Sequence, residues 1–358
     1  MSGKIPVTVI SGFLGSGKTT LLNRLLSATD ASPADAQVAA RIVVVVNELG
    51  VIGLDHTQVR HIADNVVLLE SGCICCTVRG ALVDALRELF LSALHKRIPA
   101  FERVIIETTG IADPAPIIYT LKYERFLSDR FMYDGCIAVV DGMYGAQQLQ
   151  SDPVAVQQAV LADVLAISKT DLASVEGIAG LRQQLCILNP QAVQYVTQDV
   201  PGLVQLLHAS SLRVGMTGPS AGRGLWAKQG TQRPPAHGDI RTLTMVWTEA
   251  MRRSAFIKAM SQLQADAEFE MLRVKGVLWF QGDMSASAVH GVHQQLYPIE
   301  PLDAVAGKTP VDEPAAGQEE SILVLIFRGI SSDCVEEKVK VLLPGAQPLL
   351  SSGRNFAP

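Results

Sequence analysis

Four residues near the N-terminus have the types and the spacing of a loop that binds phosphate groups. The pattern G-x-x-x-x-G-K-[ST] is met by Gly12, Gly17, Lys18 and Thr19. Glycines let the backbone wrap closely around phosphates, whose negative charge is attracted by successive N–H groups and by a helix N-terminus. We expect Lys18 to reach the β- and γ-phosphates and the Thr19 hydroxyl to ligate Mg²⁺. The predicted nucleoside triphosphate site is formed by Gly12, Gly15, Ser16, Gly17, Lys18, Thr19 and Thr20.

A second motif that could contact the phosphates or their Mg²⁺ ion lies at the end of an apolar stretch further along the chain. Glu107 ends the run over residues 103–107 and stands three residues before Gly110. A carboxylate at that place can hold the water shell of Mg²⁺, and the backbone N–H of the glycine can contact a γ-phosphate. We therefore expect Lys18 and Glu107 to be the catalytic residues of a hydrolase and Gly110 to bind nucleotide.

The segment over residues 168–171, with the sequence SKTD, resembles the N-K-x-D motif that selects guanine. The Asp171 carboxylate would accept hydrogen bonds from the N1–H and the exocyclic amine of guanine, whereas adenine presents the opposite pattern there. Lys169 would lie along the base. Ser168 replaces Asn and removes an amide that normally ties this loop to the phosphate loop, which leaves the strength of the preference open. The motif predicts GTP rather than ATP, and it argues against an ATP-dependent kinase or ligase.

Three cysteines are crowded into four positions, at Cys73, Cys75 and Cys76. Three thiolates this close suit one soft or borderline ion, Zn²⁺ first and Cu(I) next, and they suit Mg²⁺ poorly. The alternatives are a redox pair, or buried cysteines that act as small apolar residues. Six cysteines in a chain of 358 residues do not suggest a disulfide framework. The crowding therefore favours metal or redox chemistry in a reducing compartment.

The motifs follow short apolar, β-branched runs that are typical of strands buried on both faces of a parallel sheet. Such runs cover residues 7–10, 42–46, 66–69, 103–107, 136–140 and 164–167. Helical spacing occurs between them, over residues 21–26 and 81–94. Strands that alternate with helices and end in polar residues predict an α/β fold of the P-loop NTPase type. Its sheet would be doubly wound and mostly parallel, with ligands at the carboxyl edge.

The composition changes between residues 214 and 238, where Gly and Pro recur as in a linker. We therefore expect a nucleotide-binding domain over residues 1–213, a linker over 214–238 and a C-terminal domain over 239–358. In the C-terminal part, strand patterns cover residues 241–248, 272–280 and 321–327, and helical patterns cover residues 251–267 and 333–343. Residues 287–297 are ambiguous. This order of elements predicts a smaller α+β domain.

Composition and charge exclude several classes of protein. Hydrophobic residues make up 48% and charged residues 18% of the chain, which is typical of a folded protein. The longest apolar runs are far too short to cross a bilayer, and the N-terminus offers no signal-peptide core. We therefore expect a cytoplasmic protein without a membrane partner. The net charge of −5 gives no basic surface for nucleic acid.

Five segments occur in a fixed order: GFLGSGKTTLLN, NELGVIGLD, ESGCICC, VIIETTGIADPAPII and SKTD. They resemble the CobW family of metal-handling P-loop GTPases, and ETTGIADPAPII and RVKGVLWF are most similar to its YjiA-like branch. The resemblance covers nearly the whole chain and implies a C-terminal domain of the CobW type. It also implies a GTP-hydrolysing metallochaperone that passes Zn²⁺ or Co²⁺ to a client metalloprotein.

The resemblance also implies roles for particular positions. The transferred ion would be bound by Cys73, Cys75 and Cys76. Asn47 and Glu48 would lie in the first switch, and Thr19 and Glu107 would serve Mg²⁺. Many members have Glu where this chain has Val51, so the fourth ligand of the transferred ion would be water, Glu48 or a residue of a partner. Pairing across the nucleotide in related GTPases implies a GTP-dependent homodimer.

A different function stays open on the same residues. The chain would then be a nucleotide-gated interaction protein that activates one specific metalloenzyme, with cysteines that serve structure only. Metal affinity that depends on the bound nucleotide favours the chaperone, and indifference favours the activator. The histidine-rich tract of many family members is absent, and we expect His290 and His293 to be polar surface residues.

Overall fold

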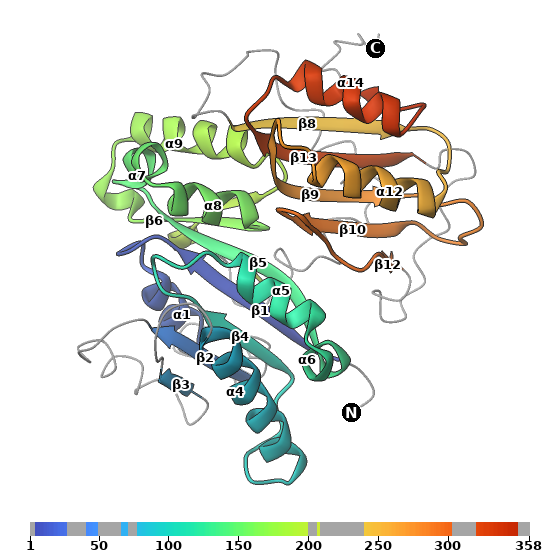
Figure 1. The fold of residues 1–358 in the computed structure, drawn as a ribbon. Helices are drawn as coiled ribbons and strands as arrows, with labels where there is room; N and C mark the ends of the chain where they lie inside the picture. The colour runs from blue at the N-terminus through green and yellow to red at the C-terminus, as the bar shows by residue number, and fades with distance from the viewer. Residues whose placement is uncertain are drawn as a thin grey trace, which may run out of the picture. The chain divides into compact units, whose positions relative to one another are not determined.

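The computed structural model describes residues 4–26, 41–48, 66–70, 77–199, 206–207, 240–302 and 320–349. These residues form two compact units, one around an N-terminal sheet and one around a C-terminal sheet (Figure 1). The short segment Cys186–Gln191 groups with the second unit. The whole of the expected linker lies outside the described residues, so the domain bounds given above stay a prediction.

The first unit is built on a seven-stranded sheet in which all neighbouring strands run parallel, in the order β3-β2-β4-β1-β5-β6-β7. The strands are β1 Ile5–Gly12, β2 Ile42–Glu48, β3 Val66–Glu70, β4 Arg103–Glu107, β5 Phe131–Asp141, β6 Val164–Ser168 and β7 Val193–Val196. Their continuous apolar sequences follow from burial on both faces; Val44, Ile105 and Ala166, for example, are at most 2% exposed. The predicted parallel α/β fold is confirmed.

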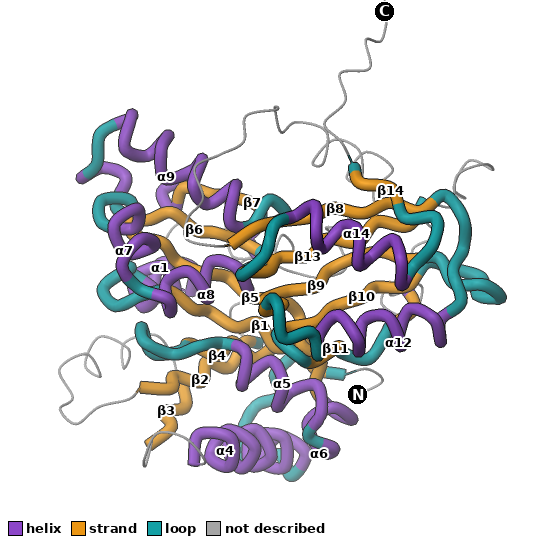
Figure 2. The backbone as a smooth tube through the Cα atoms, turned by 45° about the horizontal axis from the view of Figure 1, so that its top comes forward, coloured by secondary structure: helices purple, strands orange, loops and turns teal. Residues whose placement is uncertain are grey.

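Helices connect these strands and cover the sheet. They are α1 Lys18–Leu26, α4 Thr77–Leu94, α5 Ala115–Tyr123, α6 Arg125–Arg130, α7 Gly145–Ser151, α8 Pro153–Leu161 and α9 Val175–Leu188, with the 3₁₀ turns η1 Thr170–Leu172 and η2 Thr197–Asp199. Helix α8 packs against β1 and β5, while α4, α5 and α6 pack together (Figure 2). Among the described helices, none is both long enough and apolar enough to cross a membrane.

Two strands differ from the sequence prediction for identifiable reasons. Strand β5 begins at Phe131, five residues before the predicted run, because its first residues pair with Ile5 and Pro6 of β1. Strand β7 was not predicted at all. It is the edge strand of the sheet, and its four residues are only half-buried, so no continuous apolar run marks it.

The second unit contains a sheet whose strands all pair antiparallel, in the order β11-β10-β9-β13-β8-β14, with β12 beside β10. The strands are β8 Ile240–Trp247, β9 Glu270–Leu278, β10 Ser287–Val292, β11 Gln295–Leu296, β12 Glu300–Pro301, β13 Ser321–Arg328 and β14 Gln347–Pro348. Among the described residues of this unit, the helices are α12 Arg253–Gln264 and α14 Ser332–Leu342. The predicted smaller α+β domain is therefore present.

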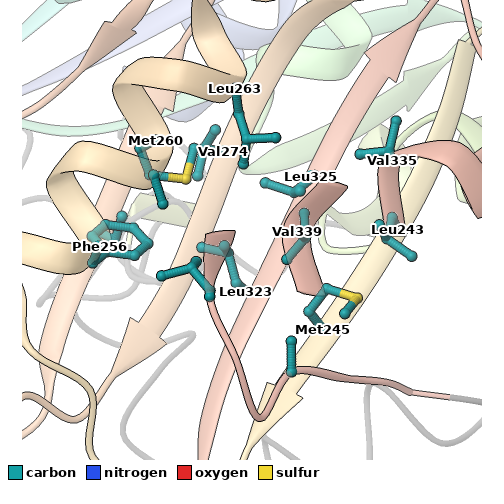
Figure 3. Close-up of a cluster of buried hydrophobic side chains, with 14 of the residues drawn as sticks. Leu243, Met245, Phe256, Met260, Leu263, Val274, Leu323, Leu325, Val335 and Val339 are labelled. Atoms are coloured by element: carbon teal, nitrogen blue, oxygen red, sulfur yellow. The ribbon is translucent and has the colours of Figure 1, made fainter. Parts of the chain in front are cut away.

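The core of this unit lies between the sheet and helices α12 and α14. Side chains of α12, such as Phe256 and Met260, face Leu323 and Leu325 of β13, while Val339 of α14 packs on the same face (Figure 3). All five are fully buried. Complete burial of such a side chain contributes about 1.5–3 kcal/mol relative to leaving it exposed, so this face holds the two helices on the sheet.

Two details of the second unit correct the sequence prediction. Helix α12 begins two residues later than expected, because Met251 exchanges backbone hydrogen bonds with Trp279 and Gln281. His290 lies on β10 and is only 9% exposed, so it is not a surface residue. His293 follows the strand in a left-handed conformation with φ 51°, and its Nδ1 lies 3.3 Å from Oε1 of Glu270.

Candidate nucleotide-binding site

The predicted nucleotide residues meet at one edge of the first sheet. Strand pairing aligns Ile10 with Glu107 and Asp141 with Ser168, and the strands involved are all parallel. The carboxyl ends of β1, β4, β5 and β6 therefore lie side by side. Polar groups that follow parallel strands at such an edge form the ligand sites of open α/β sheets.

The phosphate loop has a backbone that requires glycine. Gly12, Gly15 and Gly17 have φ values of 143°, 70° and 91°, a region that side chains disfavour. A Cβ atom on Gly12 would also collide with the carbonyl oxygen of Val139. The loop is closed by a hydrogen bond of 3.1 Å from the Ser16 N–H to the Phe13 carbonyl, and α1 begins directly after it. Thr20 lies exposed in the first turn of α1.

Lys18 folds back over this loop. Its Nζ donates hydrogen bonds to the carbonyl oxygens of Gly12 at 2.9 Å and Phe13 at 3.2 Å, and the residue is 8% exposed. The ammonium group is thus held in the middle of the phosphate loop. The Ser16 hydroxyl is buried there as well, and within the described residues its oxygen has no hydrogen-bond partner. Both groups are placed to meet phosphate oxygens.

Thr19 and Glu107 come together although 88 residues separate them. The Thr19 hydroxyl donates to Oε1 of Glu107 at 2.7 Å, and Glu107 is only 4% exposed. A hydroxyl and a carboxylate are hard oxygen donors of the kind that Mg²⁺ prefers. This donor set therefore fits the expected Mg²⁺ ion beside the phosphate loop.

Gly110 lies against the phosphate loop after β4. A Cβ atom on Gly110 would lie 2.6 Å from the Cα, N and Cδ2 atoms of Leu14. The preceding residues are fixed by a hydrogen bond from the Thr108 N–H to the Ile10 carbonyl at 2.9 Å and by a turn between Thr109 and Ala112. The structure thus brings Gly110 to the loop that would hold the phosphates.

Ser168 ties the guanine motif to the phosphate loop, which corrects the expectation that replacing Asn removes such a tie. The Ser168 hydroxyl donates to the carbonyl oxygen of Ser16 at 2.6 Å. Lys169 adds a second link, because its Nζ donates to the carbonyl oxygen of Gly15 at 2.7 Å. A short hydroxyl is sufficient here because β6 ends close to the loop: a Cβ on Gly17 would lie 3.8 Å from the Ser168 side chain.

Asp141 belongs to this site, although the sequence marked it only as the end of a strand. Its carboxylate accepts hydrogen bonds from the N–H groups of Met143 and Tyr144 and forms an ion pair of 2.7 Å with Lys169. Burial raises the pKa of Asp141, but the bonds from Lys169, Tyr144 and Met143 together outweigh this, and the pKa is lowered from that of an ordinary aspartate. The buried carboxylate therefore stays charged and orients Lys169.

We expect Asp141→Asn to destabilise the protein by about 1–3 kcal/mol at neutral pH, because the amide loses the charged hydrogen bond to Lys169. A carboxylate with a lowered folded-state pKa contributes stability above its unfolded pKa, and this stability is lost as the pH falls through the folded pKa. Urea denaturation of both proteins should thus show a constant difference in unfolding free energy at neutral pH that shrinks as the pH falls below the ordinary pKa of an aspartate. A difference of the same size in strong acid would contradict a role for the charge.

Asp171 lies exposed at the start of η1, where its Oδ1 accepts a hydrogen bond of 3.1 Å from Nε2 of Gln198. The Oε1 atom of Gln198 accepts a hydrogen bond of 3.1 Å from the Thr170 hydroxyl. Gln198, in η2, therefore holds the guanine motif in place. Sequence patterns could not reveal it, because it lies on a turn 27 residues away with no motif of its own.

The expected metal ligands fall largely outside the described part of the chain. Cys73, Cys75 and Cys76 are among the residues that the structure does not describe, and for Glu48 it describes only the backbone. The backbone of Glu48 pairs with Glu70 at the end of β3, and both strands run parallel to β4 and its neighbours. Within the described residues, no group of three or more His, Cys, Asp or Glu side chains could hold a metal ion.

Both the N-terminal and the C-terminal parts of this chain are similar in sequence to known protein families. Residues 6–195 match the model of the "CobW/HypB/UreG, nucleotide-binding domain" family, and residues 240–343 match the "Cobalamin synthesis protein cobW C-terminal domain". The "Zinc chaperone YjiA" of Escherichia coli is 30% identical over 347 residues, which cover 95% of this chain and 98% of that protein. The "Zinc-regulated GTPase metalloprotein activator 1" of Schizosaccharomyces pombe is 31% identical over 52% of this chain and 44% of its own length.

A solved structure has the same fold over nearly the same length. The "Zn(II)-bound YjiA GTPase from E. coli" superposes with a TM-score of 0.66 at 24% identity, covering 95% of this chain and 99% of that one. Both family models match in chain order, and the phosphate loop, Glu107 and the guanine motif lie at one edge of the sheet. The chain therefore belongs to the CobW/HypB/UreG family of nucleotide-binding proteins.

Proposed function

We propose that this chain is a GTP-driven metallochaperone that binds Zn²⁺, or else Co²⁺, at its crowded cysteines and passes the ion to a client metalloprotein. The observation that carries the proposal is the contact between Thr19 and Glu107 beside the phosphate loop, on the sheet to which β3 also belongs. Cys73 follows β3 by three residues in the sequence. The names of the relatives, a zinc chaperone and a zinc-regulated GTPase activator, support the same function.

For GTP hydrolysis, each residue has a task that its position supports. The loop amides would bind the phosphates, and Lys18 would turn from the Gly12 carbonyl to neutralise their charge. Thr19 and Glu107 would hold Mg²⁺, which supplies charge neutralisation at the β- and γ-phosphates when bound. The N–H of Gly110 would face the γ-phosphate. Because Thr19, Glu107 and Gly110 are held in place before nucleotide arrives, they would help to stabilise charge that develops during transfer.

We expect Asp171→Asn to erase or reverse the preference for GTP over ATP. The carboxylate accepts from both donors on the guanine edge, whereas an amide offers only one acceptor and adds a donor. Sites that hydrogen-bond a substrate in this way discriminate strongly, so kcat/KM for GTP should fall at least about tenfold. Steady-state turnover of both nucleotides measures the effect, with Asp199→Asn as an exposed control on η2. If the wild-type protein turns over GTP and ATP equally well, the assignment of Asp171 is wrong.

The cysteines would make the site for the transferred ion. Cys73, Cys75 and Cys76 supply three thiolates, a set that suits Zn²⁺. Zinc binding should release protons, since free thiols with a pKa of about 8.5 must ionise to bind the metal. The position of Val51 cannot donate, so Glu48, water or a client residue would complete the shell. An incomplete protein shell would leave the ion exchangeable, as a carrier requires.

A zinc competition titration tests the function. It is run without nucleotide, with GDP and with a non-hydrolysable GTP analogue, on wild type and on Cys75→Ser. We expect one Zn²⁺ per chain and an affinity that changes by about 5–150-fold between nucleotide states, the usual range of coupling between two sites. Cys75→Ser should lose stoichiometric zinc while GTP still binds. Equal affinity in all three states would favour the alternative, a nucleotide-gated activator with structural cysteines.

The partners we propose are the client metalloprotein and, in the GTP state, a second copy of this chain. Large apolar side chains are exposed on the loops that follow the strands at the nucleotide edge. They are Leu14, Ile111, Met143, Tyr144 and Leu172, each at least 49% exposed. Clustered exposed apolar groups commonly mark interaction sites. We place this cycle in the cytoplasm, where GTP is available.

A further inference from the structure

Gln158 reaches from helix α8 to the turn that follows β4. Its Nε2 donates hydrogen bonds to the carbonyl oxygens of Gly110 at 3.2 Å and Ala112 at 3.0 Å. The residue is 2% exposed, so these bonds are shielded from water. Its Oε1 is also buried and has no hydrogen-bond partner among the described residues. The side chain is therefore used as a double donor, which an amide can be and a carboxylate cannot.

The turn that Gln158 contacts is held from two directions. Gly110 lies so close to Leu14 of the phosphate loop that no Cβ would fit, and its carbonyl accepts from Gln158. The helix that carries Gln158 is itself well fixed. Asp152 caps α8 by accepting from the Val154 N–H at 2.8 Å, and α8 packs against β1 and β5. Gln158 thus connects a rigid helix to the loop beside the phosphates.

We infer that Gln158 is a positioning residue that holds the Gly110 turn against the phosphate loop and thereby sets the preference for a nucleoside triphosphate over the diphosphate. This inference rests on the proposed function, in which the Gly110 N–H faces the γ-phosphate. The two nucleotides differ only in that phosphate. A turn that is already ordered loses less conformational entropy when the γ-phosphate binds, which favours GTP. GDP has no γ-phosphate to contact the turn, so its affinity does not depend on this order.

The first test is Gln158→Met, which keeps the length of the side chain and removes both donors. Affinity for a non-hydrolysable GTP analogue should fall about three- to tenfold, the size expected for one or two buried hydrogen bonds, while affinity for GDP stays within about twofold. Gln150→Met is the control. Gln150 is an exposed glutamine on α7, and its replacement should change neither affinity.

The second test, Gln158→Glu, adds a readout that a purely structural role would not produce. An ionised carboxylate would face two carbonyl oxygens, whereas a protonated carboxyl can donate to one of them. Burial raises the pKa of such a carboxyl group, so the GTP-to-GDP affinity ratio should recover as the pH is lowered from about 8 to about 6. Wild type, measured at each pH, supplies the reference. This variant carries the test if Gln158→Met does not fold.

The outcomes separate the inference from the function on which it rests. A selective loss for the GTP analogue in Gln158→Met, with recovery of Gln158→Glu at low pH, supports the positioning role. An equal loss for GTP analogue and GDP, or no change in either, overturns it. If wild type binds neither nucleotide, the proposed function fails instead, and that result is visible before any variant is made.

Discussion

Lys18→Ala is expected to lower GTP turnover by at least about 100-fold, the usual cost of removing one group that stabilises transition-state charge. The ammonium group lies in the middle of the phosphate loop, within 3.2 Å of two of its carbonyl oxygens. No other described lysine or arginine shares that position, since Lys169 bonds to Gly15 and Asp141 at the side of the loop. Single-turnover and steady-state assays of phosphate release measure the effect.

The same variant should stay folded. Lys18 donates two hydrogen bonds to loop carbonyls, and the loss of these bonds should cost about 1–3 kcal/mol, far less than the stability of two packed units. Lys18→Met keeps the aliphatic stem and should lose as much turnover with less destabilisation. Lys4→Ala, an exposed lysine before β1, is the control for a change in charge. Collapse of thermal stability without nucleotide would show that Lys18 is structural.

Sequence patterns predict most strands of the first unit because these strands are buried on both faces of the sheet. Burial demands continuous apolar runs, so the prediction for residues 103–107 has the same bounds as β4. The phosphate loop was predictable for a related reason. Glycine is favoured at the φ values of Gly12, Gly15 and Gly17, so this backbone constraint can be recognised from residue type.

The contacts that fix the site were not predictable, because they join distant residues through ordinary polar side chains. Gln158 meets Gly110 across 48 residues, and Gln198 meets Asp171 across 27. An isolated Gln gives no periodic signal. Asp141 carried a weak signal, since it ends a strand at the same edge as Glu107, but its role depends on the ion pair with Lys169.

Ser168 shows a different limit of motif reasoning. The N-K-x-D pattern assigns the tie to an amide, and replacing Asn by Ser suggested that the tie is lost. In the structure a hydroxyl group makes this link instead of an amide, because the Ser168 hydroxyl donates to the Ser16 carbonyl oxygen at 2.6 Å. A motif specifies a residue type, whereas the fold requires only a donor at that distance.

Gly110→Ala should reduce GTP turnover by at least about 100-fold, which is the cost of displacing a positioned group by about 1 Å. The added Cβ would lie 2.6 Å from the Cα and N atoms of Leu14, so the turn or the phosphate loop must move. Overpacking of this kind also costs about 1–3 kcal/mol of stability. Turnover assays and thermal unfolding of the purified variant measure both effects.

Gly80→Ala is the matched control. Gly80 lies in helix α4, and a Cβ there would meet no atom of the described residues within 4 Å. Replacing a helical glycine by alanine should stabilise the protein by about 0.5–1 kcal/mol and leave turnover unchanged. Shortening Leu14 should not rescue Gly110→Ala, because two of the three atoms in the collision belong to the backbone. Wild-type turnover in Gly110→Ala, or rescue by Leu14→Ala, would mean that the turn can leave the phosphate loop without loss, and the proposed contact between Gly110 and the γ-phosphate would then be wrong.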